Sequence, residues 1–147
     1  MQPQKYRFGP RSAEKLNSVI PQLQAICHRA LAYGVMDFSV IEGQRSIKRQ
    51  QKLFAEGKSA IDGISAKSKH NETPSLAVDL LPHPHTLNGV NVWADKQRFC
   101  VLSGLMQAAA AELNLTLRWG GDWDGDGNNA DSNFHDLPHF ELTGADQ

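Results

Sequence analysis

Residues 68–79 contain a histidine and a carboxylate that could share one metal ion. Asp79 lies inside the otherwise apolar run 76–81, and His70 lies on the polar segment before it. A carboxylate in an apolar strand costs several kcal/mol to remove from water unless a partner or a cation compensates it. His70 is close enough along the chain to turn toward the same ion. The pair therefore predicts part of a metal site.

A second cluster lies at residues 135–142, with the sequence His-Asp-Leu-Pro-His-Phe-Glu-Leu. His139 is predicted to open a short strand there. Two histidines and one carboxylate are a common ligand set for catalytic zinc, and they leave the fourth coordination position open for water. Zinc lowers the pKa of that water to near neutrality and polarises a peptide carbonyl. His70, Asp79 and His139 together therefore indicate a metal-dependent hydrolase.

Asp136 is the predicted general base of this site. It precedes His139 by three residues, across a turn that Pro138 would stiffen. Such a reaction needs a carboxylate to accept a proton from the attacking water and to pass it to the departing amine. The other histidines are interpreted as surface residues or as core residues whose hydrogen bonds are satisfied. These are His28, His83, His85 and His135.

The acidic loop at 122–131 is a second candidate metal site, for calcium. Oxygen-bearing side chains alternate along it, at Asp122, Asp124, Asp126 and Asn128. Alternating oxygen ligands with a glycine at the sixth position, here Gly127, are typical of the first half of a calcium-binding loop. The Glu that such loops carry at the twelfth position is absent, because Asn133 stands there. A solvated acidic turn is the alternative interpretation.

Helices and short strands follow one another without a regular βαβ repeat, which favours an α+β fold. Helices are predicted over 12–20, 23–31, 46–57 and 99–113. Gly34 is the expected C′ residue of the second helix, and Ser46 is the expected N-cap of the third. Strands are predicted over 37–41, 76–81, 115–119 and 139–142, with Pro82 ending the second strand. The polar segments 57–75 and 120–133 are predicted as long loops, which are often functional.

Length and composition describe one globular domain over residues 1–147. The chain is 40% hydrophobic and 21% charged, with a formal net charge of −1 that gives no reason to expect nucleic acid as a partner. Lys and Arg gather before residue 70, which suits either a polyanion such as the bacterial wall or a solvated face. No segment reads as a membrane span or a signal peptide. Cys27 and Cys100 are both predicted to be buried free thiols.

Two blocks of this sequence resemble the signature of the zinc peptidases that include D-Ala-D-Ala carboxypeptidases and dipeptidases. The signature is Ser-x-His, an Ala-Val-Asp strand, and an acidic residue three before a final His. Here the blocks are Ser68 to His70, Ala77 to Asp79, and Asp136 to His139. The phage endolysin branch, which cleaves between L-alanine and D-glutamate of the peptidoglycan stem peptide, is the most similar. Segments that look typical of that branch are Phe8–Ser12, Trp119–Trp123 and Asp136–Leu142.

The resemblance implies that His70, Asp79 and His139 are the zinc ligands and that Asp136 is the catalytic base. The sequence departs from the family pattern in two places. The segment between His70 and Asp79 is longer than is usual in the family, because Asn71 to Val78 intervene. The base is also Asp where many relatives have Glu. These departures put the shape of the loop and the placement of the base in question.

Arg45 and Ser68 also match positions of interest in the family. Arg45 matches an arginine that binds substrate or stabilises the oxyanion, and a fixed guanidinium suits that developing charge. A surface ion pair is the alternative for Arg45. Ser68 is assigned to substrate binding, with formation of the turn before His70 as the alternative.

The resemblance implies a single domain of the Hedgehog/D-Ala-D-Ala-peptidase type, with a small antiparallel sheet and packed helices. The implied activity is that of a zinc endolysin that hydrolyses the L-alanyl-D-glutamate bond of peptidoglycan, as a monomer and without membrane insertion. A D-Ala-D-Ala carboxypeptidase or dipeptidase and a zinc-stabilised peptide-binding module are the alternatives. Synthesis in a host cytoplasm, and action on the periplasmic wall after release through a holin-type pore, are the expected localisation.

Overall fold

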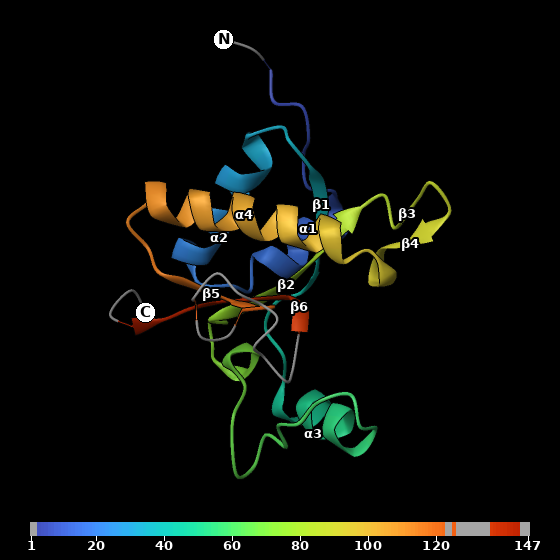
Figure 1. Ribbon diagram of the computed structural model, residues 1–147. Coiled ribbons are helices and arrows are strands. Elements are labelled where there is room, and N and C mark those ends of the chain that lie inside the picture. The colour runs from blue at the N-terminus through green and yellow to red at the C-terminus, as the bar shows by residue number, and fades with distance from the viewer. Residues whose placement is uncertain (1–2, 123–124, 126–135, 145–147) are drawn as a thin grey trace.

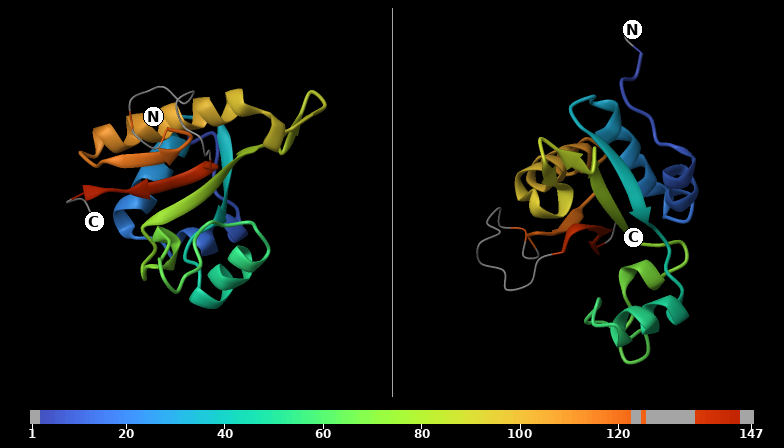
Figure 2. Two further views of the ribbon diagram at one scale, coloured as in Figure 1. Left: turned by 60° about the horizontal axis from the view of Figure 1, so that its bottom comes forward. Right: turned by 90° about the vertical axis from the view of Figure 1, so that its right-hand side faces the viewer.

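An antiparallel sheet with the strand order β1-β2-β6-β5 lies at the centre of the computed structural model, which describes residues 3–122, 125 and 136–144 (Figure 1). The strands are β1 (Asp37–Glu42), β2 (Ala77–His83), β5 (Leu117–Gly120) and β6 (Asp136–Leu142). The left view of Figure 2 shows them side by side, with the long helix α4 (Lys96–Glu112) above β5. The two central strands, β2 and β6, come from distant parts of the chain, and their pairing sets Asp79 opposite His139.

Helices α1 (Pro10–Leu16), α2 (Pro21–Ala32) and α4 cover one face of the sheet, whereas α3 (Ile47–Ala55) belongs to a lobe on the other side (Figure 1). Successive side chains of a strand point to opposite faces. In the central strands, Val78, Leu80, Phe140 and Leu142 belong to the core cluster with α2 and α4. Asp79 and His139 alternate with these residues, and they therefore face away from the helices.

The helix predictions are largely confirmed, with shifted ends. The first helix begins at Pro10 and ends at Leu16, earlier than predicted. Gly34 follows α2 with a φ of 71°, which suits a C′ glycine. The Ser46 side chain accepts a hydrogen bond from the Arg49 N–H and so caps α3 as predicted.

Two prolines lie inside strands, whereas Pro82 was predicted to end a strand and Pro138 to stiffen a turn. Pro82 lies inside β2 and pairs with Phe38 of β1. Strand β6 pairs with β2 only up to Asp79, so β2 has a single neighbour at Pro82 and tolerates a residue without an N–H. Pro138 likewise lies within β6, at a register irregularity opposite β5. Asp136 is therefore the first residue of the strand that carries His139, and no turn separates them.

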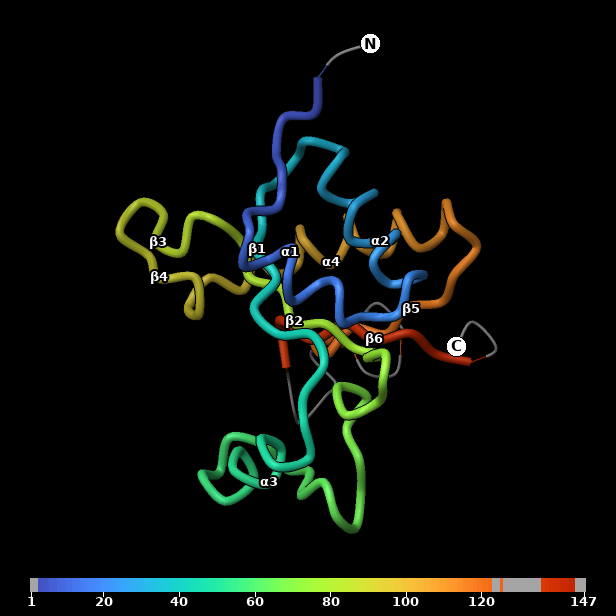
Figure 3. Tube along the Cα trace, turned by 180° about the vertical axis from the view of Figure 1, so that it is seen from behind, coloured from blue at the N-terminus to red at the C-terminus, as the bar shows by residue number. Residues whose placement is uncertain are grey.

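A hairpin of β3 (Thr86–Leu87) and β4 (Val90–Asn91) is absent from the sequence prediction. It projects from the side of the domain, as the tube in Figure 3 shows, and leads through the short 3₁₀ helix η2 (Val92–Ala94) into α4. Asn88 and Gly89 connect the strands with φ values of 51° and 79°. An Asn-Gly pair with both φ values positive is the preferred two-residue hairpin turn, so the signal was present in the sequence.

The prediction for the cysteines is right for Cys27 and wrong for Cys100. Both thiols are free, but only Cys27 is buried, on α2. Cys100 lies on the exposed side of α4, whereas the preceding residue, Phe99, faces the core. Burial raises the pKa of the Cys27 thiol to about 12. Among the described residues, no helix has the length and hydropathy that crossing a membrane requires.

We expect one thiol per native chain to react with a disulfide reagent at pH 8, and two thiols after denaturation. The thiolate is the reacting form, so the inaccessible Cys27 stays unreactive while Cys100 reacts. Titration with Ellman's reagent, with and without guanidinium, measures both numbers. Two fast thiols in the native protein would contradict the burial of Cys27.

Candidate metal centre

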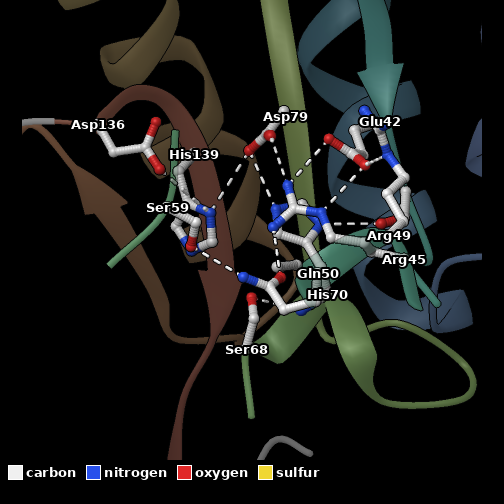
Figure 4. A network of polar contacts seen from close by, with 12 residues as sticks. Glu42, Arg45, Arg49, Gln50, Ser59, Ser68, His70, Asp79, Asp136 and His139 are labelled. Carbon is white, nitrogen blue, oxygen red and sulfur yellow. Dashed lines mark hydrogen bonds and ion pairs between the residues drawn. The ribbon is translucent and has the colours of Figure 1, made fainter. Parts of the chain in front are cut away.

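The three predicted metal ligands meet on the face of the sheet that points away from the helices (Figure 4). His70, Asp79 and His139 each offer one ligand atom, and these atoms all lie within 4.8 Å of one another. All three side chains are buried. Asp79 comes from β2, His139 from β6, and His70 from the 3₁₀ helix η1 (Lys69–Asn71). This trio is the one candidate metal-binding group found in the described part of the chain.

The long segment between His70 and Asp79 is accommodated without separating the two ligands. Its last part runs beside the end of α1, where the Ser75 N–H donates to the Ser18 carbonyl and the Ile20 N–H donates to the Ser75 carbonyl. Just before this segment, the Ser68 side chain accepts a hydrogen bond from the His70 N–H and caps η1. Ser68 therefore shapes the turn that carries His70, whereas its contact with substrate stays a prediction.

The hydrogen bond made by His70 fixes which of its nitrogens faces Asp79. Its Nδ1 lies 2.8 Å from the Gly43 carbonyl oxygen, which only accepts, so Nδ1 carries the proton. The Nε2 atom, which presents a lone pair when the ring is neutral, lies 3.1 Å from Oδ1 of Asp79. Gly43 is required at this point, since a Cβ would collide with the Lys15 carbonyl and the Ser18 hydroxyl.

The distances around Asp79 fit a zinc ion. The same Oδ1 atom lies 3.1 Å from His70 Nε2 and 3.4 Å from His139 Nδ1. Ligand atoms at about 2.0–2.1 Å from a tetrahedral zinc ion lie about 3.3 Å from each other. Two facing acceptors, such as His70 Nε2 and a carboxylate oxygen, repel each other unless a proton or a cation lies between them. The donor set is therefore suited to a metal ion.

Charges in the site are strongly coupled in the metal-free state. Burial opposes ionisation of Asp79, but hydrogen bonds to His139 and His70 outweigh it and hold the pKa of this carboxyl well below its usual range. Burial likewise opposes the charged form of His139. Hydrogen bonds to Asp79 and Glu141 dominate and raise the pKa of His139 to about 9. The metal-free site is thus held together by a buried imidazolium and a carboxylate.

Metal binding is expected to release at least one proton per chain at pH 7.5. His139 is protonated below its pKa of about 9 and must lose a proton to become a ligand, so metal affinity falls as the pH drops below 9. Calorimetry in two buffers that differ in ionisation enthalpy counts the released protons. Binding at pH 7.5 without proton release would show that His139 is neutral before the metal arrives.

Asp136 is held beside the metal ligands at the start of β6. Its Oδ2 atom lies 3.9 Å from His139 Nδ1, and its side chain is 38% exposed, so it is reachable from solvent. Burial, with the nearby charge of Asp79, raises the pKa of Asp136. Gly120 of β5 pairs with Asp136, and a Cβ at Gly120 would collide with the Asp136 carbonyl. The predicted base is therefore close to the trio but outside it.

Arg45 is buried, which contradicts a surface ion pair. Its Nε and Nη2 atoms donate to the two carboxylate oxygens of Glu42, and its Nη1 donates to Gln50 (Figure 4). The guanidinium lies 3.8 Å from Oδ2 of Asp79. The Arg45 N–H also donates to the His70 carbonyl. Arg45 thus joins the strand β1, the α3 lobe and the metal site.

Sequence reasoning missed four residues that surround the predicted site, and they are Glu42, Gln50, Arg118 and Glu141. Gln50 is fully buried, with its amide donating to Ser59 and to the Ile61 carbonyl. Glu141 is buried within the apolar end of β6. A carboxylate in an apolar strand was the signal that singled out Asp79, and the same signal was available for Glu141.

The remaining site predictions fall outside the trio. His28, His83 and His85 are exposed, as expected of residues without a role in the metal site. His135 lies outside the described residues. Of the acidic loop proposed for calcium, only Asp122 and Gly125 are described, so that prediction stays a prediction.

Comparisons with known proteins agree with this architecture. A family model described as phage L-alanyl-D-glutamate peptidase matches residues 4–143. An L-alanyl-D-glutamate peptidase of Escherichia phage T5 is 33% identical over 131 residues, which cover 89% of this chain and 88% of the phage protein. The crystal structure of the L-Ala D-Glu endopeptidase ChiX of Serratia marcescens superposes with a TM-score of 0.73 at 32% identity, covering 95% of this chain and 92% of that one.

The predicted α+β fold, with a small antiparallel sheet and packed helices, is confirmed by this structural match. The fold places a buried ligand trio and an adjacent carboxylate at the centre of the sheet. The family model matches the sequence over nearly the whole length of the chain. The chain therefore belongs to the phage L-alanyl-D-glutamate peptidase family and is a peptidase.

Proposed function

We propose that this peptidase is zinc-dependent and cleaves the L-alanyl-D-glutamate bond of peptidoglycan stem peptides. The observation that carries the proposal is the buried trio of His70, Asp79 and His139, whose facing acceptor atoms call for a cation. The names of the phage T5 and Serratia relatives supply the bond. The substrate makes the bacterial wall the site of action.

In the proposed mechanism His70, Asp79 and His139 hold the zinc ion. When bound, zinc supplies Lewis acidity toward water and toward the scissile carbonyl. Asp136 accepts the proton of the attacking water and delivers it to the nitrogen of the departing D-glutamate residue. Its raised pKa suits this exchange, since a base with a higher pKa accepts a proton more readily.

Arg45 is proposed to face the negative charge that develops on the carbonyl oxygen. Glu42 accepts hydrogen bonds from the Nε–H and one Nη2–H of Arg45, and Gln50 accepts one from an Nη1–H of Arg45. A guanidinium has five N–H donors, so one remains on each terminal nitrogen. Fixed donors of this kind stabilise an oxyanion without reorganising during the reaction. The contacts with Glu42 and Gln50 would hold the guanidinium in place.

Product analysis tests the proposed bond. Purified peptidoglycan is digested with the zinc-loaded protein, and the products are separated by mass spectrometry after labelling of new amino groups. We expect a new amino terminus on D-glutamate, and no product after the metal is removed with a chelator. Released D-alanine without labelled D-glutamate would identify a carboxypeptidase instead. Tight binding without any product would leave only a peptide-binding module.

A further inference from the structure

We propose that Glu141 is a positioning residue that orients His139 for metal binding, and that Arg118 holds Glu141 in turn. The inference rests on the proposed zinc site and adds two residues behind it. Glu141 is not one of the three candidate metal ligands. It acts on the opposite nitrogen of the His139 ring.

The geometry of His139 divides its two nitrogens between two tasks. Its Nδ1 faces Asp79 at 3.4 Å, whereas its Nε2 lies 2.8 Å from Oε1 of Glu141. A carboxylate oxygen only accepts, so Nε2 carries the proton and Nδ1 presents its lone pair once the second proton is lost. His139 and Glu141 are two residues apart on β6 and therefore share a face of the sheet. The strand itself thus sets the distance between them.

Arg118 supplies the next contact, from the neighbouring strand. It lies opposite Glu141 in the register of β5 and β6, and its Nη2 donates to Oε2 of Glu141 at 2.9 Å. The Arg118 side chain is 44% exposed, whereas that of Glu141 is only 4% exposed. The arginine therefore stays hydrated while it compensates a buried carboxylate, which would otherwise be costly. Each oxygen of Glu141 has its own donor.

Only a carboxylate can serve both neighbours. His139 Nε2 and Arg118 Nη2 are both donors, so the residue between them needs two acceptor atoms. Glutamine at this position has one acceptor and one amide donor, and it would face either His139 or Arg118 with the wrong group. A metal-bound histidine that donates its other N–H to a carboxylate is a better-oriented and more basic ligand. Glu141 and Arg118 meet this requirement together.

The test measures zinc affinity, by competition with a chromophoric chelator, for the parent chain and for Glu141→Gln and Glu141→Ala. We expect both variants to bind zinc about 10–100-fold more weakly. Nitrogen-15 shifts of the His139 ring report its tautomer directly and should show Nε2–H in the zinc-bound parent. Glu112→Gln is the matched control, because Glu112 pairs with Arg29 on the surface, and its zinc affinity should equal that of the parent.

A zinc affinity within twofold of the parent in both Glu141 variants, with an unchanged His139 tautomer, would overturn the inference and leave Glu141 a purely structural role. Should the Glu141 variants fail to fold, Arg118→Ala gives the answer instead. It removes a half-exposed side chain and should still weaken zinc binding, while Arg118→Lys restores part of it. An unaltered affinity in Arg118→Ala would remove Arg118 from the proposal. A parent that binds no zinc contradicts the proposed function itself.

Discussion

Replacing Asp136 with asparagine is expected to lower kcat for peptidoglycan hydrolysis by about 10²–10⁴-fold, the usual contribution of a general base. Zinc binding should change little, since the nearest Asp136 oxygen lies 3.9 Å from His139 Nδ1 and outside the ligand trio. The asparagine has nearly the same shape but cannot accept the proton of the attacking water. Single-turnover rates on a soluble stem peptide, measured beside zinc stoichiometry, separate the two effects.

Two further variants sharpen the test of Asp136. Asp136→Glu keeps a carboxylate on a longer arm and should retain more activity than Asp136→Asn. Asp37→Asn is the matched control, because Asp37 pairs with His83 at the far end of β1 and should have no effect on the rate. A rate for Asp136→Asn within tenfold of the parent, with zinc bound, would assign the base to another group.

The convergence of His70, Asp79 and His139 could be predicted from the sequence because each occupies an unusual place and the blocks around them resemble a family signature. Asp79 interrupts an apolar run, His70 lies on the polar segment before it, and His139 follows an acidic residue by three positions. The partners behind them were harder to predict. Glu42 and Gln50 lie only three and five residues from Arg45 along the chain, but they belong to two different elements, β1 and α3. Arg118 and Glu141 meet because β5 and β6 are neighbouring strands, and no local pattern encodes that pairing.

The errors in the fold prediction have the same origin. Pro82 continues its strand because β6 pairs only with the first part of β2, a fact of the assembled sheet. Cys100 was assigned to the core from an apolar helix, but the side of α4 that meets α2 depends on how the helices pack. The β3–β4 hairpin has a different explanation, because the Asn88-Gly89 pair is itself a local sequence signal for a hairpin turn. This hairpin was therefore predictable from the sequence alone.

Replacing Asp79 with asparagine should abolish the response of the protein to zinc while leaving the metal-free fold intact. The amide nitrogen, in the place of Oδ1, has two N–H groups and can donate to His70 Nε2 and to Nδ1 of a neutral His139, so both rings keep a partner. The metal loses its anionic ligand, and two histidines alone bind zinc weakly. The parent should gain about 2.7 kcal/mol in its free energy of unfolding when free zinc reaches one hundred times the Kd. Asp79→Asn should gain nothing at that concentration.

Denaturant titrations with chelator and with zinc give both free energies for each protein, and Asp37→Asn again serves as the matched control. The comparison isolates the metal site from general effects on the fold, because each variant is its own metal-free reference. A zinc-induced gain in Asp79→Asn equal to that of the parent would mean that the ion binds elsewhere. The central pairing of β2 with β6 would then be a framework for the fold alone, since Asp79 and His139 would meet there without a ligand to share.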